Sequence, residues 1–345
     1  MKQRLIRYIL GLMSLLVLSA TIFYVQFLDF LDSPLAITAD VVIDVRPGSS
    51  MQQIANQLAA VAHLERPRLF RLWARYHGFD TGLKAGEYAL RTGMSPRIAL
   101  AHLMSGQSIQ YPVVFIEGTS VRQALQTLWS SPKLLNTLQD KSDPEILSML
   151  QGAVATAMPN PMTSLEGLLF PDTYFYTSGA TDISILRRSA AQLQTILAEE
   201  WEQREADLPF TTPYEALILA SIVEKESGLL SEREQIAGVF VRRLQSGMRL
   251  QSDPTVIYGM GDAYNGNIRR VDLDATTPYN TYRIDGLPPT PIAMTGRDAL
   301  HATLHPSDDT ALYFVARGDG GHHFSNTLEE HNAAVRRYLL NNSPQ

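Results

Sequence analysis

Two carboxylates, Glu224 and Glu226, close an apolar run near the middle of the sequence. The run, residues 217–223, is apolar on nearly every face of a helix and therefore belongs in a core. A carboxyl group at the end of such a helix is partly buried, which raises its pKa toward that of a useful general acid. Helices also often end in solvated charge, and the spacing does not rank the two glutamates. The pair is a candidate acid/base centre.

Start and stop signals position this helix. Thr212 is the expected N-cap, Pro213 the first helical residue and Glu215 the third, which completes a capping box. Gly228 is expected just after the helix end, so residues 217–227 should lie inside the helix.

A second helix is predicted to follow at once. Ser231 and Glu234 form another capping-box pattern, and Gly247 follows the expected last helical residue, Ser246. Two antiparallel helices with a short connection then place the carboxylates at a helical corner, facing the residues after 247.

The segments after this corner mix amide, carboxylate, hydroxyl and aromatic side chains, a mixture that suits the polar edges and apolar faces of sugar rings. Each segment alone also fits an ordinary rigid loop. The segments are 248–259, 278–282 and 286–291. Their candidate substrate-orienting or supporting residues are Gln251, Asp253, Asn280 and Tyr282.

A last polar block, residues 318–324, follows an apolar strand predicted at 312–316. It contains His322 and His323, but we expect no metal here. The H-x-x-x-H spacing of a helical zinc pair is missing from the block, and adjacent histidines rarely share one ion. His322 is a candidate substrate contact, and no cofactor is expected.

The composition excludes several classes of protein. The 345-residue chain has a net charge of -6 and no basic run after the N-terminus, so a nucleic-acid partner is not expected. It has no cysteine, which excludes disulfides, thiolate catalysis and Cys-ligated zinc.

Residues 1–30 are predicted to be a cytoplasmic stub and a transmembrane anchor. Residues 8–28 carry no acidic or basic side chain and are long enough to cross a ~30 Å hydrocarbon core. Basic residues precede the stretch and acidic ones follow it, so the positive-inside rule places the N-terminus in the cytoplasm and the remainder in the periplasm. A cleaved signal peptide is the alternative, but its apolar region is usually shorter, and no A-x-A-like site is evident near Ser19. We expect a single-pass protein of the inner, cytoplasmic membrane.

Residues 38–112 are predicted to form a small domain. A strand at 41–45, helices at 51–61 and 66–76, and a strand at 86–90 give the order β-α-α-β. This unit resembles the LysM-like modules, which bind polymers that contain N-acetylglucosamine. A structural spacer is the alternative.

Turn-forming residues indicate where other helices and loops begin. Three Gly-x-Ser triplets place Ser50, Ser95 and Ser120 as N-caps at strand-to-helix turns. Residues 130–161 carry several prolines with little periodicity, so loops and short helices are expected there.

Five blocks in a fixed order resemble those of the YceG-like family. They are 224–227, 250–259, 279–282, 286–289 and 320–324. The resemblance implies an α+β fold in which the catalytic domain, residues 113–341, follows the anchor and the LysM-like domain. It also implies an endolytic lytic transglycosylase that cleaves the MurNAc-β-1,4-GlcNAc bond of nascent peptidoglycan strands and leaves 1,6-anhydro-MurNAc ends. Peptidoglycan synthases are the implied protein partners.

The resemblance maps the family's catalytic acid/base onto Glu226, which is followed by a hydroxyl residue, Ser227. Glu224 becomes a supporting neighbour. One carboxyl group then donates and later accepts the proton, without water. A hydrolytic muramidase that uses Asp253 as a second carboxylate, and a non-catalytic wall-binding scaffold, are the alternatives.

Overall fold

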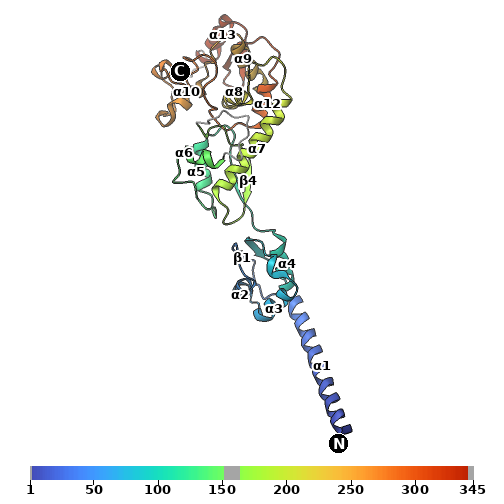
Figure 1. The fold of residues 1–345 in the computed structure, drawn as a ribbon. Helices are drawn as coiled ribbons and strands as arrows, with labels where there is room; N and C mark the ends of the chain where they lie inside the picture. Colours follow the sequence, from blue (N-terminus) through green and yellow to red (C-terminus); the bar gives the residue numbers. More distant parts are fainter. Residues whose placement is uncertain (1, 151–163, 341–345) are drawn as a thin grey trace. The chain divides into compact units, whose positions relative to one another are not determined.

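The protein divides into two compact units in the computed structural model, which describes residues 2–150 and 164–340 (Figure 1). One unit holds the residues up to 111 together with 177–179, and the other holds 112–176 and the residues from 180 onward. Both units mix helices and strands, which confirms the predicted α+β class.

Helix α1 (Lys2–Asp32) is the one helix in the described part of the chain that is long and apolar enough to cross a membrane. None of its most apolar window is buried by the protein. Its last turn packs against α4, with Leu31 fully buried. An exposed apolar helix of this length fits the predicted single-pass anchor.

The rest of the first unit has the predicted strand-helix-helix-strand order, followed by one more helix. Its elements are β1 (Val41–Val45), α2 (Met51–Val61), α3 (Pro67–Tyr76), the 3₁₀ turn η1 (Phe79–Thr81), β2 (Gly86–Leu90) and α4 (Pro96–Ser105). Strands β1 and β2 are antiparallel, with Val41 opposite Leu90. Ile54, Phe70 and Tyr88 are fully buried and join the helices to the strands in one core. The likeness to LysM modules remains a prediction.

The three predicted serine N-caps are confirmed. The side chains of Ser50, Ser95 and Ser120 each accept a hydrogen bond from the backbone N–H three residues further on. The glycine two residues before each serine has a positive φ of 79°, 88° or 71°, a conformation that other residues rarely adopt. Each triplet therefore ends an extended segment and starts a helix.

The second unit begins with β3, and its described residues form two short helices and one long helix before the buried centre. Its elements are β3 (Tyr111–Val114), α5 (Val121–Trp129), α6 (Asp143–Leu150), β4 (Thr173–Tyr176), α7 (Asp182–Glu202), α8 (Pro213–Glu226), η2 (Leu230–Glu232), α9 (Arg233–Gln245), α10 (Asp253–Met260), η3 (Gly261–Ala263), α11 (Arg270–Asp274), α12 (Arg297–Leu304), β5 (Tyr313–Ala316), β6 (His322–Ser325), α13 (Leu328–Val335) and the π-helical turn η4 (Arg336–Leu340). Strand β3 pairs with β4, and β5 with β6 in an antiparallel hairpin.

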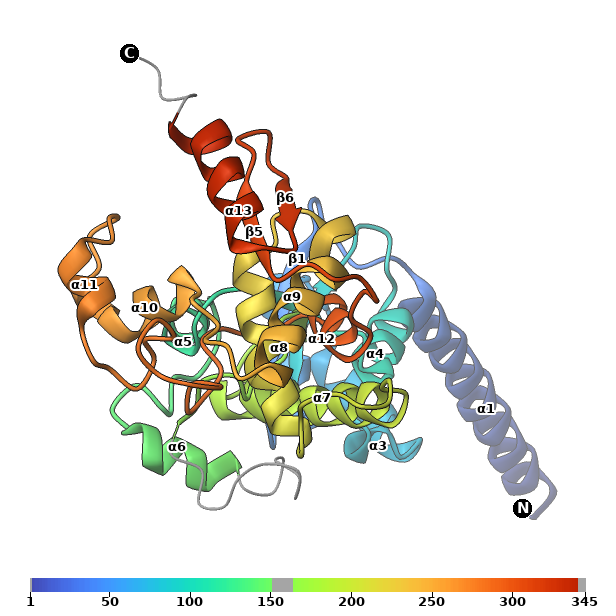
Figure 2. The same cartoon turned by 90° about the horizontal axis from the view of Figure 1, so that it is seen from above.

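Helix α8 forms the centre of this unit. Every residue from 216 to 224 is buried, as the sequence predicted for an apolar rod. Helices α7, α9 and α12 pack against it, and Figure 2 shows α8 lying between α9 and the α7 layer. The catalytic candidates therefore extend from the end of a rigid, enclosed helix.

Two predictions about this unit are wrong, and a third falls partly outside the described residues. Helix α8 ends at Glu226 with Ser227 as an extended C-cap, and Gly228 does not have the positive φ of a C′ glycine. Ser231 does not cap α9, because a 3₁₀ turn intervenes and the helix starts at Arg233. Of the segment 130–161, the short helix α6 is observed, whereas the prolines at 159 and 161 lie outside the described residues.

Candidate active site

The predicted capping box starts α8 as expected. Thr212 Oγ1 accepts the Glu215 N–H at 3.3 Å, the Glu215 carboxylate accepts the Thr212 N–H at 3.2 Å, and Pro213 is the first helical residue. These local bonds fix where the helix begins, and its length then puts Glu226 at its last position.

The Glu226 carboxyl is half-buried and accepts a short hydrogen bond from Ser252 Oγ at 2.6 Å. Burial raises its pKa, and the negative charge of Asp253 raises it further. The Ser252 hydrogen bond and the charges of His322 and Arg243 act in the opposite direction without cancelling the effect. Glu226 therefore holds a proton more readily than an ordinary glutamate, as a general acid must.

A strained turn and buried hydroxyls fix Ser252. Gln251, the residue before it, has a φ of 54°, which is uncommon for a residue with a side chain. The Ser252 N–H donates to Thr281 Oγ1 at 2.9 Å, and Thr255 Oγ1 lies 2.8 Å from the same hydroxyl. These contacts hold the Ser252 hydroxyl toward Glu226.

Three of the predicted residues, Gln251, Asp253 and Tyr282, lie near Ser252. Tyr282 Oη donates to Asp253 Oδ1 at 2.7 Å, and Asp253 is the first residue of α10. Gln251 Oε1 lies 3.4 Å from Arg243 Nη1, which also donates to the Leu250 carbonyl at 2.7 Å. Carboxylate, phenol, amide and guanidinium groups therefore gather around Glu226, a set that can bind sugar hydroxyls.

His322 completes this set from the β5–β6 hairpin. Its Nδ1 lies 2.8 Å from Glu232 Oε2, and its backbone N–H donates to both oxygens of the same carboxylate at 3.1 Å. Because a carboxylate only accepts, Nδ1 carries the proton, and the ring orientation is fixed. Glu232 therefore positions His322 beside Glu226.

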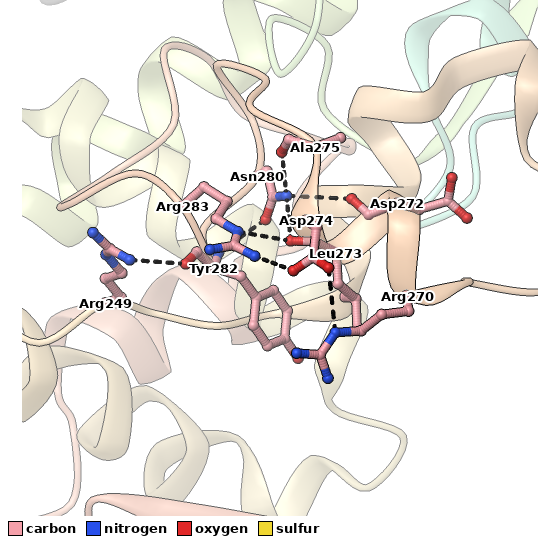
Figure 3. A network of polar contacts seen from close by, with 9 residues as sticks. All are labelled: Arg249, Arg270, Asp272, Leu273, Asp274, Ala275, Asn280, Tyr282 and Arg283. Atoms are coloured by element: carbon pink, nitrogen blue, oxygen red, sulfur yellow. Dashed lines mark hydrogen bonds and ion pairs between the residues drawn. The ribbon is translucent and has the colours of Figure 1, made fainter.

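Asn280 organises the loop that carries Tyr282, and Figure 3 shows its side chain among the backbone groups of that loop. Its side chain is almost completely buried, and Nδ2 lies within hydrogen-bond distance of three backbone carbonyls, the closest being Ala275 O at 2.6 Å. Its Oδ1 accepts the Tyr282 N–H at 3.0 Å. Asn280 thus holds the backbone of Tyr282 instead of presenting an amide to solvent.

Glu224 and Ser227 point elsewhere. Two residues on a helix differ by about 200° in direction, so Glu224 and Glu226 emerge on opposite sides. Glu224 Oε1 accepts from Arg233 Nη2 at 2.8 Å and Oε2 from the Gly296 N–H at 2.9 Å. Ser227 Oγ donates to the Leu229 carbonyl at 2.9 Å. The structure therefore separates the two carboxylates that the sequence could not rank.

We expect that Ser252→Ala will lower activity roughly ten-fold and move the high-pH limb of the activity profile upward. Ser252 stabilises the ionised form of Glu226, so its loss raises the pKa of Glu226 further and preserves the protonated acid to higher pH. A pH profile of kcat/KM tests this. The matched control is Ser227→Ala, whose hydroxyl bonds Leu229, and a similar shift there would contradict the assignment.

Another acid, Glu166, is buried in the same unit and was not predicted from the sequence. It accepts the Val121 N–H at 3.0 Å, and burial raises its pKa to about 7. The stability that its protonated form contributes is present below the unfolded pKa of 4.5 and is lost as pH rises to about 7. We expect roughly 3 kcal/mol to be lost across this range. Denaturant titrations from pH 4.5 to 8 measure the free energy of unfolding. In Glu166→Gln this pH-dependent loss of stability should be absent.

Sequence reasoning missed three residues of the site: Ser252, Arg243 and Glu232. Each reaches Glu226 or His322 across a turn or from another element, so no local spacing identifies it. Ser252 lies inside the block 250–259, and its small hydroxyl between two larger polar residues was the one available signal.

The fold and the site together define a protein whose candidate acid/base is one half-buried carboxyl group, Glu226, among groups that can bind hydroxyls. The model of the YceG-like family matches residues 43–337, and the chain belongs to this family. It is 31% identical over 309 residues to the endolytic murein transglycosylase of Bacillus subtilis (strain 168), covering 86% of this chain and 84% of that one.

Two further relatives extend the comparison. The endolytic murein transglycosylase of Streptococcus pneumoniae serotype 2 (strain D39 / NCTC 7466) is 29% identical over 341 residues, which cover 90% of this chain but 61% of that longer protein. The 2.6 Å crystal structure of a YceG-like protein from Listeria monocytogenes, lmo1499, aligns with a TM-score of 0.55 and 28% identity, covering 85% of this chain and 98% of that one.

Proposed function

We propose that this chain is an endolytic peptidoglycan lytic transglycosylase that cleaves the MurNAc-β-1,4-GlcNAc bond of nascent glycan strands and so ends their elongation. The observation that carries the proposal is the Glu226 carboxyl: half-buried, with a raised pKa, and in contact with Ser252. The relatives named endolytic murein transglycosylase supply the substrate class.

Glu226 performs both proton transfers in this proposal. Its protonated carboxyl donates to the glycosidic oxygen as the bond from that oxygen to MurNAc C1 breaks. The C6 hydroxyl oxygen of the same sugar then bonds C1, and its proton passes to the Glu226 carboxylate. The acid is regenerated, no water is consumed, and the product end is a 1,6-anhydro ring. Asp253, Tyr282, Gln251 and His322 are proposed to orient the sugars.

Mass spectrometry of digested glycan strands tests the reaction. Anhydromuramyl ends that depend on Glu226 are the expected result. Reducing muramyl ends would instead indicate a muramidase, for which Asp253 is the nearest candidate for a second carboxylate. Unchanged strands, together with retained glycan binding, would indicate a non-catalytic wall-binding scaffold.

We further propose that α1 anchors the protein in the inner membrane with its N-terminus in the cytoplasm. The basic residues Lys2, Arg4 and Arg7 precede the apolar stretch, as the positive-inside rule requires. Because the chain has no cysteine, single-cysteine variants report topology cleanly. A membrane-impermeant maleimide added to spheroplasts should label Asp319→Cys, in an exposed loop, and not Gln3→Cys. The reverse labelling would overturn the orientation.

The domain assignment and the partners are part of the same proposal. Residues 38–112 form a LysM-like module that contacts glycan strands, and residues 113–341 form the catalytic domain. Peptidoglycan synthases are the proposed protein partners, since the strands to be cut are nascent. Crosslinking in cells that captures a synthase with the wild-type chain and with Glu226→Gln alike would support this pairing.

A further inference from the structure

A cluster of three metal-ligating side chains, distinct from the candidate active site, lies between α7 and α12. Glu200 is in the last turn of α7, His301 is on α12, and His305 is the C-cap of α12. One ligand atom from each residue lies within 4.8 Å of the others. The two histidines have the H-x-x-x-H spacing that was missing from the last polar block, and their rings stack at 4.2 Å.

Both ring nitrogens of His305 lie within hydrogen-bond distance of a backbone carbonyl. Nε2 lies 2.9 Å from the Gln203 carbonyl, and Nδ1 lies 3.1 Å from the His301 carbonyl. Both partners are acceptors, whereas a neutral imidazole has one N–H. With that N–H on Nε2, the Nδ1 lone pair is left available as a metal ligand.

The surroundings provide the outer contacts that metal ligands need. Glu200 is almost completely buried, and Arg297 Nε donates to its Oε1 at 2.6 Å, which leaves Oε2 toward His301 Nδ1 at 2.8 Å. A ligand histidine usually donates its other N–H to a carbonyl, as His305 does to Gln203. His301 is exposed and His305 half-buried, so an ion can enter from solvent.

We propose that Glu200, His301 and His305 form a binding site for a divalent transition-metal ion such as Zn²⁺, with water as the fourth ligand. Two imidazoles and one carboxylate are a ligand set that zinc accepts, and a tetrahedral ion needs its donors roughly 3.3 Å apart, so modest side-chain movements close the site. The metal ties the C-terminal ends of α7 and α12 together. Because α12 packs on α8, the bound metal also stabilises the unit that carries Glu226.

Equilibrium dialysis of the full-length, EDTA-treated chain in detergent against Zn²⁺ at pH 7.5 tests the proposal. We expect one Zn²⁺ per chain with a dissociation constant in the micromolar range or below, and at least a ten-fold weaker constant for His301→Gln and His305→Gln. Gln at 305 keeps a donor for the Gln203 carbonyl. His63→Gln, in the other unit, should bind as wild type does.

Thermal unfolding distinguishes a bound metal from a bound proton. At about one hundred times its dissociation constant, Zn²⁺ should raise the Tm of wild type by roughly 5 °C or more and leave that of His305→Gln unchanged. If the Tm of His305→Gln without metal is close to that of wild type, the variant is folded. If His305→Gln does not fold, His301→Gln replaces it in the same measurement. No zinc bound by wild type, or equal binding by the histidine variants, overturns the proposal.

Discussion

Glu226→Gln is expected to lower glycan cleavage by a factor of at least about 10² to 10⁴, the usual contribution of a general acid/base. In the proposed reaction the same group donates the first proton and accepts the second, so loss of this single carboxyl removes both steps. Release of anhydromuramyl fragments from purified peptidoglycan is the measurement.

The same variant should be at least as stable as wild type at pH 7. Burial raises the pKa of Glu226, so the folded protein favours the neutral carboxyl over the ion. A neutral amide of the same shape therefore avoids the cost of desolvating a carboxylate. A large loss of stability together with the loss of activity would mean that Glu226 is structural.

Glu224→Gln is the matched control for this experiment. Its carboxylate lies two residues away on the other side of α8, where it pairs with Arg233. The amide oxygen can still accept the Gly296 N–H. We expect activity within several-fold of wild type, and a loss as large as that of Glu226→Gln would show that both acids take part.

Local signals explain which parts of the fold the sequence predicted. The cap residues Ser50, Ser95, Ser120 and Thr212 act on N–H groups three residues away, so their patterns are readable without knowing the fold. The apolar face of residues 217–223 likewise requires burial whatever covers it. These predictions held because the interactions behind them are short-range.

The two failures among the helices have different causes. Ser231 has the pattern of a cap, yet α9 starts later, where Arg233 is placed to pair with the buried Glu224. Helix α7 was also not predicted, although its buried side chains recur at helical spacing, so the sequence held a local signal for it. A tertiary contact therefore explains where α9 starts, whereas α7 could have been predicted from its own periodicity.

In the candidate site too, local features were predicted and long-range contacts were not. Glu226 was predicted from its helix and from the family resemblance, and the structure separates it from Glu224. Its contact with Ser252 joins residues 26 positions apart, and the Glu232 contact that orients His322 spans 90 positions. Such pairings depend on how helices and hairpins pack, which residue spacing does not contain.

Asn280 gives the largest effect on stability that we expect from one side chain outside the core. Asn280→Ala removes a buried group that holds the Tyr282 N–H and the carbonyl of Ala275, so both lose a partner. We expect a loss of about 2–4 kcal/mol in the free energy of unfolding, measured by denaturant titration. Activity should fall with the folded fraction, since the side chain contacts backbone.

Asn280→Asp sharpens this prediction because it changes charge and not shape. A carboxylate at 280 faces backbone carbonyls that only accept, so the ionised form is disfavoured and its folded pKa is raised. The variant should therefore be near wild-type stability below the unfolded pKa of aspartate and lose stability as pH rises through the folded pKa. At neutral pH it should be less stable than Asn280→Ala, because a buried, unpaired carboxylate costs more than a missing hydrogen bond. Stability of Asn280→Asp that does not change with pH would mean that the side chain faces solvent or substrate instead of the backbone.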